Sequence, residues 1–114
     1  MEYYKKVEIK EHMLYASEIA ELFGILSRTN KPAIKFISQL LKEEIINKKE
    51  EQLYYNAKDG LRKVYPKSIY IDAMKKLNER LKHIKKDKQG FYYIKLNNEK
   101  NYYIKISEKR FIYL

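Results

Sequence analysis

The chain has 114 residues, of which 14% are aromatic and 35% charged, and a formal net charge of +10. This length suits a single domain with one modest core. The absence of cysteine excludes a disulfide framework, a thiol nucleophile and a cysteine zinc site. Because there is no apolar run of membrane-spanning length and no apolar signal region near residue 1, we expect a cytoplasmic protein that does not use a membrane. We also expect no cofactor.

The excess of positive charge lies in the second half of the chain. Ten basic and ten acidic side chains balance over residues 1–60, whereas residues 61–90 carry ten basic side chains and three acidic ones. Such an excess favours an anionic partner, for example nucleic acid. Lysine that only solubilises a surface rich in tyrosine and isoleucine explains the composition equally well, so a motif must decide.

The first residues carry two patterns. Over residues 2–13 the apolar side chains follow helical spacing, but residues 7–10 alternate like a strand, and we favour the helix. A short extended piece over residues 13–15 then leads to Ser17, a good N-cap residue for a helix over residues 18–23. Gly24 ends this helix, at a position where a left-handed residue is often needed.

A second, longer helix is predicted from Lys31 or Pro32 to about Glu44, since proline is tolerated in a first turn. At 100° per residue one side is apolar, with Ile34, Ile37, Leu41 and Ile45, adjoined by Ala33, Phe36 and Leu40. The opposite ridge has no acidic member and carries Lys31, Lys35, Ser38, Gln39 and Lys42. Ammonium, hydroxyl and amide groups on one ridge suit the groove of a polyanion, and we interpret this element as a recognition helix.

A β-hairpin is predicted directly after this helix. Residues 52–57 and 61–65 are strand-like, Asp59-Gly60 is a strong hairpin-turn dipeptide, and Pro66 stops the returning strand. A β-hairpin that directly follows a recognition-type helix is what is called a wing. Its basic side chains are Lys48, Lys49, Lys58, Arg62 and Lys63.

Residues 68–86 predict a long helix with a basic surface. Its apolar positions recur at spacings of 4, 3, 4 and 3, as in a coiled-coil seam about two heptads long. The seam residues are Tyr70, Met74, Leu77, Leu81 and Ile84. They fit either the interface of a homodimer or the core of the chain itself, and we favour the dimer.

The end of the chain predicts a small antiparallel meander with strands over residues 91–96, 101–106 and 110–114. One buried face is expected to hold Tyr92, Ile94 and Leu96 together with Tyr102, Ile104 and Ile106. Tyr93 and Tyr103 point the other way. We favour cross-strand packing for these two rings over a platform on which bases stack.

Residues 15–46, and less closely residues 13–65, resemble winged helix–turn–helix DNA-binding domains. The matching elements are ASEIAELFG as positioning helix, SRTN as polar turn and KPAIKFISQLLKEEII as recognition helix leading into the wing. The interval from Gly24 to Lys31 is a residue or two longer than the tightest helix–turn–helix turn. The class expected is therefore α+β: a winged helix–turn–helix, a long helix and a C-terminal β-meander in one compact domain.

The resemblance implies major-groove insertion of the second helix and backbone contacts from the turn and the wing. The base edges would be met by Lys31, Lys35, Ser38 and Gln39, with Lys42 on the same ridge. The phosphates would be met by Ser27, Arg28, Thr29 and Asn30, and on the wing by Lys58, Arg62 and Lys63. Residues 1–66 would bind DNA, and residues 67–114 would serve dimerisation or interaction.

Signals for catalysis are poor, and we expect neither an enzyme nor a metal site. His12 and His83 are far apart in the chain, lack metal-ligand spacing and are interpreted as surface residues. No Gly-rich phosphate loop exists among three glycines. The pairs Glu43-Glu44 and Glu50-Glu51 are interpreted as solvated surface charge.

The leading hypothesis is a double-stranded DNA-binding protein, a dimeric transcriptional regulator or DNA-organising factor of a mobile element such as a plasmid or virus. One alternative is a protein-interaction module, such as an antitoxin or inhibitor, that uses the C-terminal meander. Another is an RNA or single-strand binder that stacks bases on Tyr93 and Tyr103.

Overall fold

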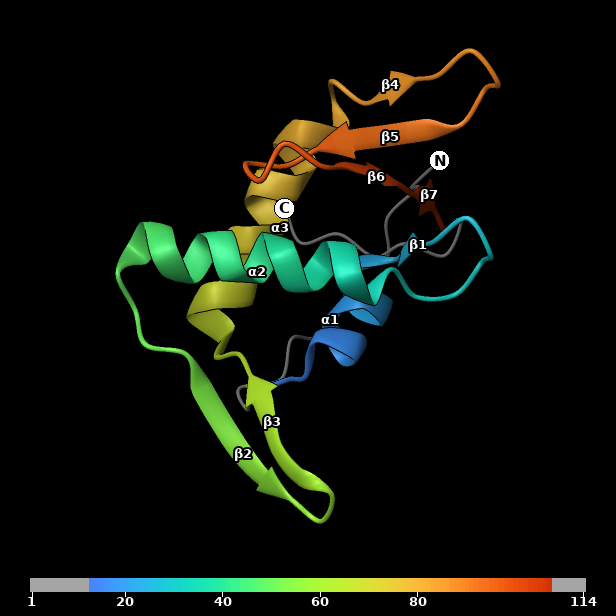
Figure 1. Ribbon diagram of the computed structural model, residues 1–114. Helices are drawn as coiled ribbons and strands as arrows, with labels where there is room; N and C mark the ends of the chain where they lie inside the picture. Colours follow the sequence, from blue (N-terminus) through green and yellow to red (C-terminus); the bar gives the residue numbers. More distant parts are fainter. Residues whose placement is uncertain (1–12, 108–114) are drawn as a thin grey trace, which may run out of the picture.

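The computed structural model describes residues 13–107, and these form a mixed α+β fold of three helices and several small antiparallel sheets (Figure 1). The α+β class is therefore confirmed. The strand expected over residues 110–114 lies outside the described residues, and so does the helix expected over residues 2–13, apart from its last residue.

Helix α1 spans Ala16–Phe23, two residues earlier than expected. The N-cap is Tyr15, so the prediction of Ser17 as N-cap is wrong. The backbone N–H of Tyr15 donates to Glu18 Oε1 at 2.9 Å, as in a capping box. Gly24 ends the helix with φ 66° and ψ 34°, and its N–H donates to the carbonyls of Ala20 and Glu21. The left-handed role predicted for Gly24 is confirmed.

The connection between the first two helices is longer than predicted. Strand β1 (Ile25–Leu26) opens it, and Leu26 forms an isolated bridge with Pro32. The N–H of Ser27 donates to the Lys31 carbonyl at 2.7 Å. Because Lys31 and Pro32 are held in this loop, they do not begin the second helix, and the predicted start there is wrong.

Helix α2 spans Ile34–Lys48, four residues beyond the predicted end, and stops at Lys49 in a left-handed conformation with φ 56°. Its apolar side is buried as the periodicity predicted, at Phe36, Ile37, Leu40, Leu41 and Ile45. Ile34 is the exception, since 45% of its surface is exposed at the first turn of the helix.

Strands β2 (Leu53–Ala57) and β3 (Gly60–Val64) form the predicted hairpin, which projects from the helices in Figure 1. The turn lies at Lys58-Asp59, and Gly60 follows it with φ 119°, a conformation that favours glycine. The hairpin is joined to the start of α1, because Leu14 and Tyr65 exchange backbone hydrogen bonds of 3.1 and 2.9 Å.

Helix α3 spans Lys67–Leu81 and packs against α2. The predicted helix over residues 68–86 is too long, because residues 82–84 turn the chain into strand β4 (Lys85–Lys86). The predicted dimer seam is also wrong as an interface. Tyr70, Met74 and Leu77 are at most 2% exposed in the chain's own core, and Leu81 and Ile84 pack partly buried against it.

The C-terminal strands do not form the simple meander that was predicted. Strand β5 (Tyr92–Lys95) pairs with β4 on one edge and with β6 (Asn101–Tyr103) on the other. Strand β7 (Lys105–Ile106) leaves this sheet and pairs with β1, which places Lys105 opposite Leu26. The end of the described chain is therefore bonded to the connection between α1 and α2.

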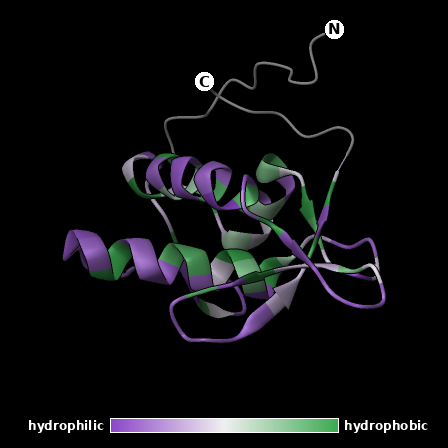
Figure 2. Cartoon of the chain, turned by 90° about the horizontal axis from the view of Figure 1, so that it is seen from above, coloured by the Kyte–Doolittle hydropathy of each residue, from purple (hydrophilic) through white to green (hydrophobic). Residues whose placement is uncertain are grey.

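One core runs through both halves of the chain. It includes Phe23, Ile37 and Tyr70 from the three helices, Ile94 from β5, and Ile104 between β6 and β7. In Figure 2 green and purple segments alternate along the helices, as expected for amphipathic helices around a shared core. Of the residues expected on the buried face of the meander, Tyr92 and Ile106 are instead 46% and 48% exposed.

Buried charges join α2 to α3. Glu43 and Glu44 are 7% and 2% exposed, so the prediction of solvated surface charge is wrong for this pair, whereas Glu50 and Glu51 are exposed. Glu43 accepts hydrogen bonds from Arg80 Nη2 at 3.2 Å and from the Asn97 N–H at 2.7 Å. Glu44 Oε2 lies 2.7 Å from Lys76 Nζ, in an ion pair without hydrogen-bond geometry. These contacts tie α2 to α3 and to the turn after β5.

A partly exposed ion pair lies at the other end of the same helix contact. Lys48 pairs with Asp72, and its Nζ also donates to the Ser68 carbonyl at 3.1 Å. The hydrogen bond from Lys48 lowers the pKa of Asp72 below its usual 3.8, and the same bond raises the pKa of Lys48 above 10.5. Lys48 therefore serves helix packing and does not belong to the hairpin.

Replacing Glu43 by alanine should lower the free energy of unfolding by about 3 kcal/mol, because it leaves the Arg80 guanidinium and the Asn97 N–H without their acceptor. Urea denaturation at pH 7 measures this change. Glu51→Ala, at an exposed position, is the control and should stay within about 0.5 kcal/mol of the wild type. Equal midpoints for the two variants would contradict a structural role for Glu43.

The contribution of Asp72 to stability should depend on pH. Its folded pKa is lowered, so its contribution is fully present above pH 3.8 and is lost as the pH falls through the folded pKa. The gap in unfolding free energy between wild type and Asp72→Asn should be constant over about pH 5–8 and close below pH 3.8. Glu79→Gln, which removes a surface pair, should show only a small gap throughout. If the difference in unfolding free energy between wild type and Asp72→Asn persisted at pH 2, the stabilising role of the ionised Asp72 carboxylate would be contradicted.

Candidate nucleic-acid interface

The predicted ridge and the hairpin meet in an open groove of about 610 Å³, here named the hairpin groove. Its walls come from the start of α1, the outer side of α2 and strand β3. Its polar lining comprises Ser17, Lys35, Ser38, Gln39, Lys42, Arg62 and Lys63. The groove thus brings together four of the five ridge residues and two of the three basic wing residues that were predicted to contact phosphates.

The hairpin groove is cationic. Lys35, Lys42, Arg62 and Lys63 are exposed, while Ser38 and Gln39 are half-buried between them. No Asp or Glu is among the residues that line it, all of which lie in the described part of the chain. Lys58 lies outside the groove, at the tip of the hairpin. Four positive charges without an acidic neighbour in the lining create a potential that attracts anions.

Two tyrosines hold one of these cations in place. The Arg62 guanidinium lies 4.1 Å from the centre of the Tyr15 ring, and Tyr15 meets Tyr55 edge to face at 6.5 Å. Tyr55 is also the cross-strand partner of Arg62. A guanidinium stacked by its face keeps its N–H edge available for a phosphate. The sequence reasoning missed the role of Tyr15, because nothing local indicates that the hairpin folds back on the residue before α1.

Tyr65 forms part of the floor of the groove and is 2% exposed. Burial raises the pKa of its phenol above 10.0, and the nearby Tyr54 adds to this shift. The phenol is therefore neutral at physiological pH, and it adds no negative charge to the groove.

A second cavity of about 320 Å³, here named the connection pocket, adjoins the hairpin groove. It lies between the connection of α1 to α2 and strand β6, and it shares Ile34 and Lys35 with the hairpin groove. The other lining residues are Ser27, Thr29, Lys31, Pro32, Ala33, Phe36, Tyr102 and Tyr103. Lys31, the fifth ridge residue, therefore lies in the connection pocket and not beside the hairpin.

The four polar residues predicted to meet phosphates are engaged within the chain. The hydroxyls of Ser27 and Thr29 are 3.0 Å apart, and the Thr29 N–H donates to Ser27 Oγ at 3.3 Å. Arg28 stacks on Phe91 and Tyr103, and Asn30 accepts a hydrogen bond from Lys105. Arg28 remains exposed despite this stacking.

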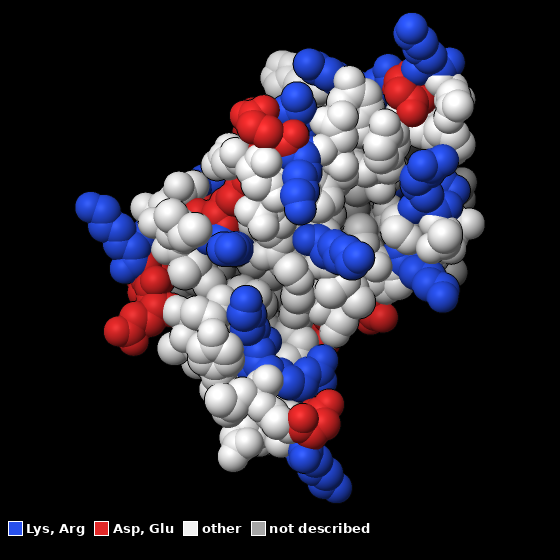
Figure 3. Space-filling view, in the orientation of Figure 1, with Lys and Arg blue, Asp and Glu red and all other residues white. Residues whose placement is uncertain are grey.

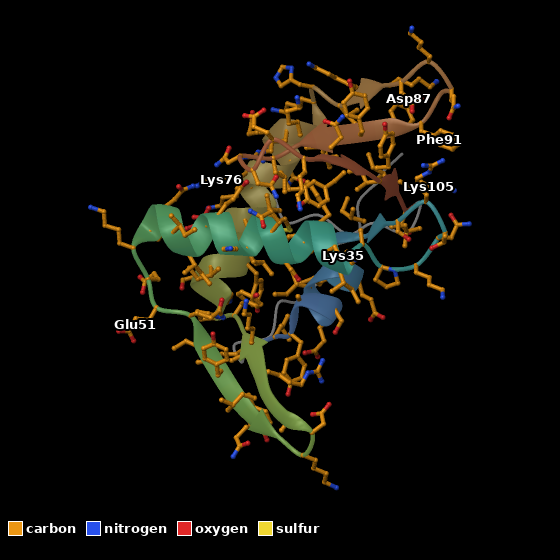
Figure 4. All side chains as sticks on the ribbon, in the orientation of Figure 1. Lys35, Glu51, Lys76, Asp87, Phe91 and Lys105 are labelled. Carbon is orange, nitrogen blue, oxygen red and sulfur yellow. The ribbon has the colours of Figure 1, made fainter. Side chains whose placement is uncertain are left out.

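The side of the molecule that carries α2 and the hairpin is rich in positive charge. Figure 3 shows Lys and Arg side chains across the face over α2 and the hairpin, with Asp and Glu mainly toward its edges. Figure 4 shows Lys35 on the outer side of α2, near the start of that helix. Several other cations are neutralised within the fold, as Lys76 and Arg80 are by Glu44 and Glu43.

The described residues contain no group of three or more His, Cys, Asp or Glu placed to hold a metal ion, and His83 is exposed. His12 lies outside the described residues. None of the helices in residues 13–107 combines the length and apolar character that crossing a membrane requires. Comparisons with family models, curated proteins and solved structures find no match to the chain.

Proposed function

We propose that this protein binds double-stranded DNA, with α2 in the major groove and the β2–β3 hairpin beside it as a wing. The observation that carries the proposal is the hairpin groove, in which cations from α2 and from β3 converge without an acidic residue in the lining. A protruding helix ridge fits the major groove, and flanking cations neutralise phosphates.

The order and attachment of the elements support a winged-helix arrangement. A short extended segment at Leu14 precedes α1, then come α2 and the hairpin, whose returning strand is bonded back to Leu14. This attachment holds the hairpin beside the recognition helix. The connection over residues 24–33 is longer than a tight helix–turn–helix turn. The angle at which α2 enters the major groove therefore need not equal that of a tight helix–turn–helix.

Within this proposal, the side chains of α2 contact base edges and those of β3 contact phosphates. Lys35 and Lys42 are the exposed cations that α2 contributes to the groove, while Gln39, half-buried between helix and hairpin, is the amide available to read adenine. Arg62 and Lys63 contact phosphates and set the register of the complex. Lysine discriminates bases less sharply than the bidentate fork of arginine, so specificity per subunit is modest.

The biological role proposed is occupancy of DNA by a transcriptional regulator or DNA-organising factor of a mobile element. A dimer on a symmetric site would multiply the modest specificity of one subunit. Because Tyr70, Met74 and Leu77 are buried in the core, such a dimer has to use a surface other than the seam on α3.

Single-strand binding on a tyrosine platform is less well supported. Tyr93 and Tyr103 are cross-strand partners whose rings pack 5.7 Å apart, as we expected. The Tyr103 ring also has the Arg28 guanidinium 5.3 Å from its centre. Bases would have to displace Arg28 before they could stack there.

Reversing the charge of Lys35 should abolish preferential binding to a duplex site. Lys35→Glu places a carboxylate where the hairpin groove and the connection pocket meet, and we expect at least a tenfold loss of affinity, or about 1.4 kcal/mol, with little change in the unfolding midpoint. Fluorescence anisotropy with a selected duplex measures the loss. Lys88→Glu, an exposed residue in the turn between β4 and β5, makes the same charge change outside both cavities and should bind almost normally. Wild-type affinity in Lys35→Glu would refute the proposed interface.

Affinity for duplex DNA should fall steeply as salt rises, by roughly 0.9 log units per log unit of salt for each phosphate contacted. The same titration with single-stranded DNA and with RNA of equal length compares the alternatives directly. We expect the duplex to bind most tightly at every salt concentration. A preference for a single strand would shift the assignment to the tyrosine platform, and a slope near zero would rule out phosphate neutralisation as the source of affinity.

A further inference from the structure

Three cations lie around the connection between α1 and α2, outside the lining of the hairpin groove. Arg28 and Lys31 come from the connection between α1 and α2, and Lys105 comes from β7. Figure 4 shows Phe91 and Lys105 beside this connection. Among the described residues, none of the three cations takes part in an ion pair.

Arg28 is held by aromatic rings and not by a carboxylate. Its guanidinium carbon lies 4.2 Å from the centre of the Phe91 ring and 5.3 Å from that of Tyr103. Stacking of this kind uses the flat face of the guanidinium and restricts its rotation. The N–H groups on its edge can still donate two parallel hydrogen bonds to a phosphate.

Lys105 is positioned by two separate contacts. Its backbone is in register with Leu26 through the pairing of β7 with β1, and its Nζ donates to Asn30 Oδ1 at 3.1 Å. An ammonium group has three N–H donors, so the bond to Asn30 leaves donors for an anion. Asn30 itself has φ 63°, a left-handed conformation that asparagine tolerates well.

We propose that Arg28, Lys31 and Lys105 form a second phosphate-binding cluster, which the C-terminal strands position next to the start of α2. The occupant is the sugar–phosphate backbone of the duplex already bound by the hairpin groove, so this inference rests on the proposed function. Lys31 lines the connection pocket, which shares Ile34 and Lys35 with the hairpin groove, so at least this member of the cluster adjoins the surface that leads to the hairpin.

The consequence is that residues 91–107 belong to the DNA interface and not to a separate interaction module. In this arrangement the recognition helix is flanked by Arg62 and Lys63 on one side and by the second cluster on the other. Phe91 is a positioning residue, because it acts on phosphate only through the guanidinium of Arg28.

The test is a salt titration of duplex binding by wild type, Arg28→Gln, Lys105→Gln and Phe91→Leu. It is carried out at a temperature well below the thermal unfolding midpoint of each variant. Each glutamine variant should reduce the slope of log K against log salt by roughly 0.9, because one phosphate contact is lost. Phe91→Leu keeps the net charge and much of the apolar volume. It should nevertheless lower both affinity and slope, a change that a purely structural role would not produce.

Lys75→Gln is the control, since it removes one positive charge from an exposed side chain of α3 outside both cavities. We expect its slope to equal that of the wild type. Wild-type slopes in Arg28→Gln and Lys105→Gln would overturn the second cluster, and so would an equal reduction in Lys75→Gln, which would reflect net charge alone. Failure of the wild type to bind duplex DNA would instead refute the proposed function itself. Loss of binding in Lys35→Glu with no effect at Arg28 and Lys105 would overturn only the present inference.

Discussion

Burial of the apolar side of α2 is the interaction on which the rest of this structure depends. Phe36, Ile37, Leu40 and Leu41 are at most 2% exposed, and both α1 and α3 pack against this helix. Each fully buried side chain of this size contributes about 1.5–3 kcal/mol, so the position of α2 is fixed strongly. Since one side of the helix is committed to the core, the ridge that carries Lys35 and Lys42 faces outward.

Two backbone pairings then place the parts that flank the ridge. The bridge between Leu14 and Tyr65 holds the hairpin beside one end of α1, and the pairing of β1 with β7 holds the α1–α2 connection against the C-terminal strands. Both pairings join segments far apart in the sequence. They place the hairpin and the C-terminal strands next to the helix that carries the basic ridge.

The distribution of ion pairs separates cations that are matched to carboxylates from cations that are not. Lys48, Lys76 and Arg80 are matched to Asp72, Glu44 and Glu43, and together they secure α3 against α2. Arg28 and Arg62 are matched to aromatic rings, which restrict a guanidinium without cancelling its charge. Both arginines therefore keep their positive charge at the molecular surface.

The local pattern of the sequence was enough to determine the α+β class, the buried side of α2, the hairpin and the left-handed end at Gly24, because each depends on neighbours within a few residues. It could not determine what covers an apolar stripe. The heptad spacing of Tyr70, Met74 and Leu77 fits a second subunit and the chain's own core equally well, and only the packing against α2 decided it. The burial of Glu43 and Glu44 and the pairing of β1 with β7 were likewise decided by tertiary structure, since their partners lie 32 to 81 residues away along the chain.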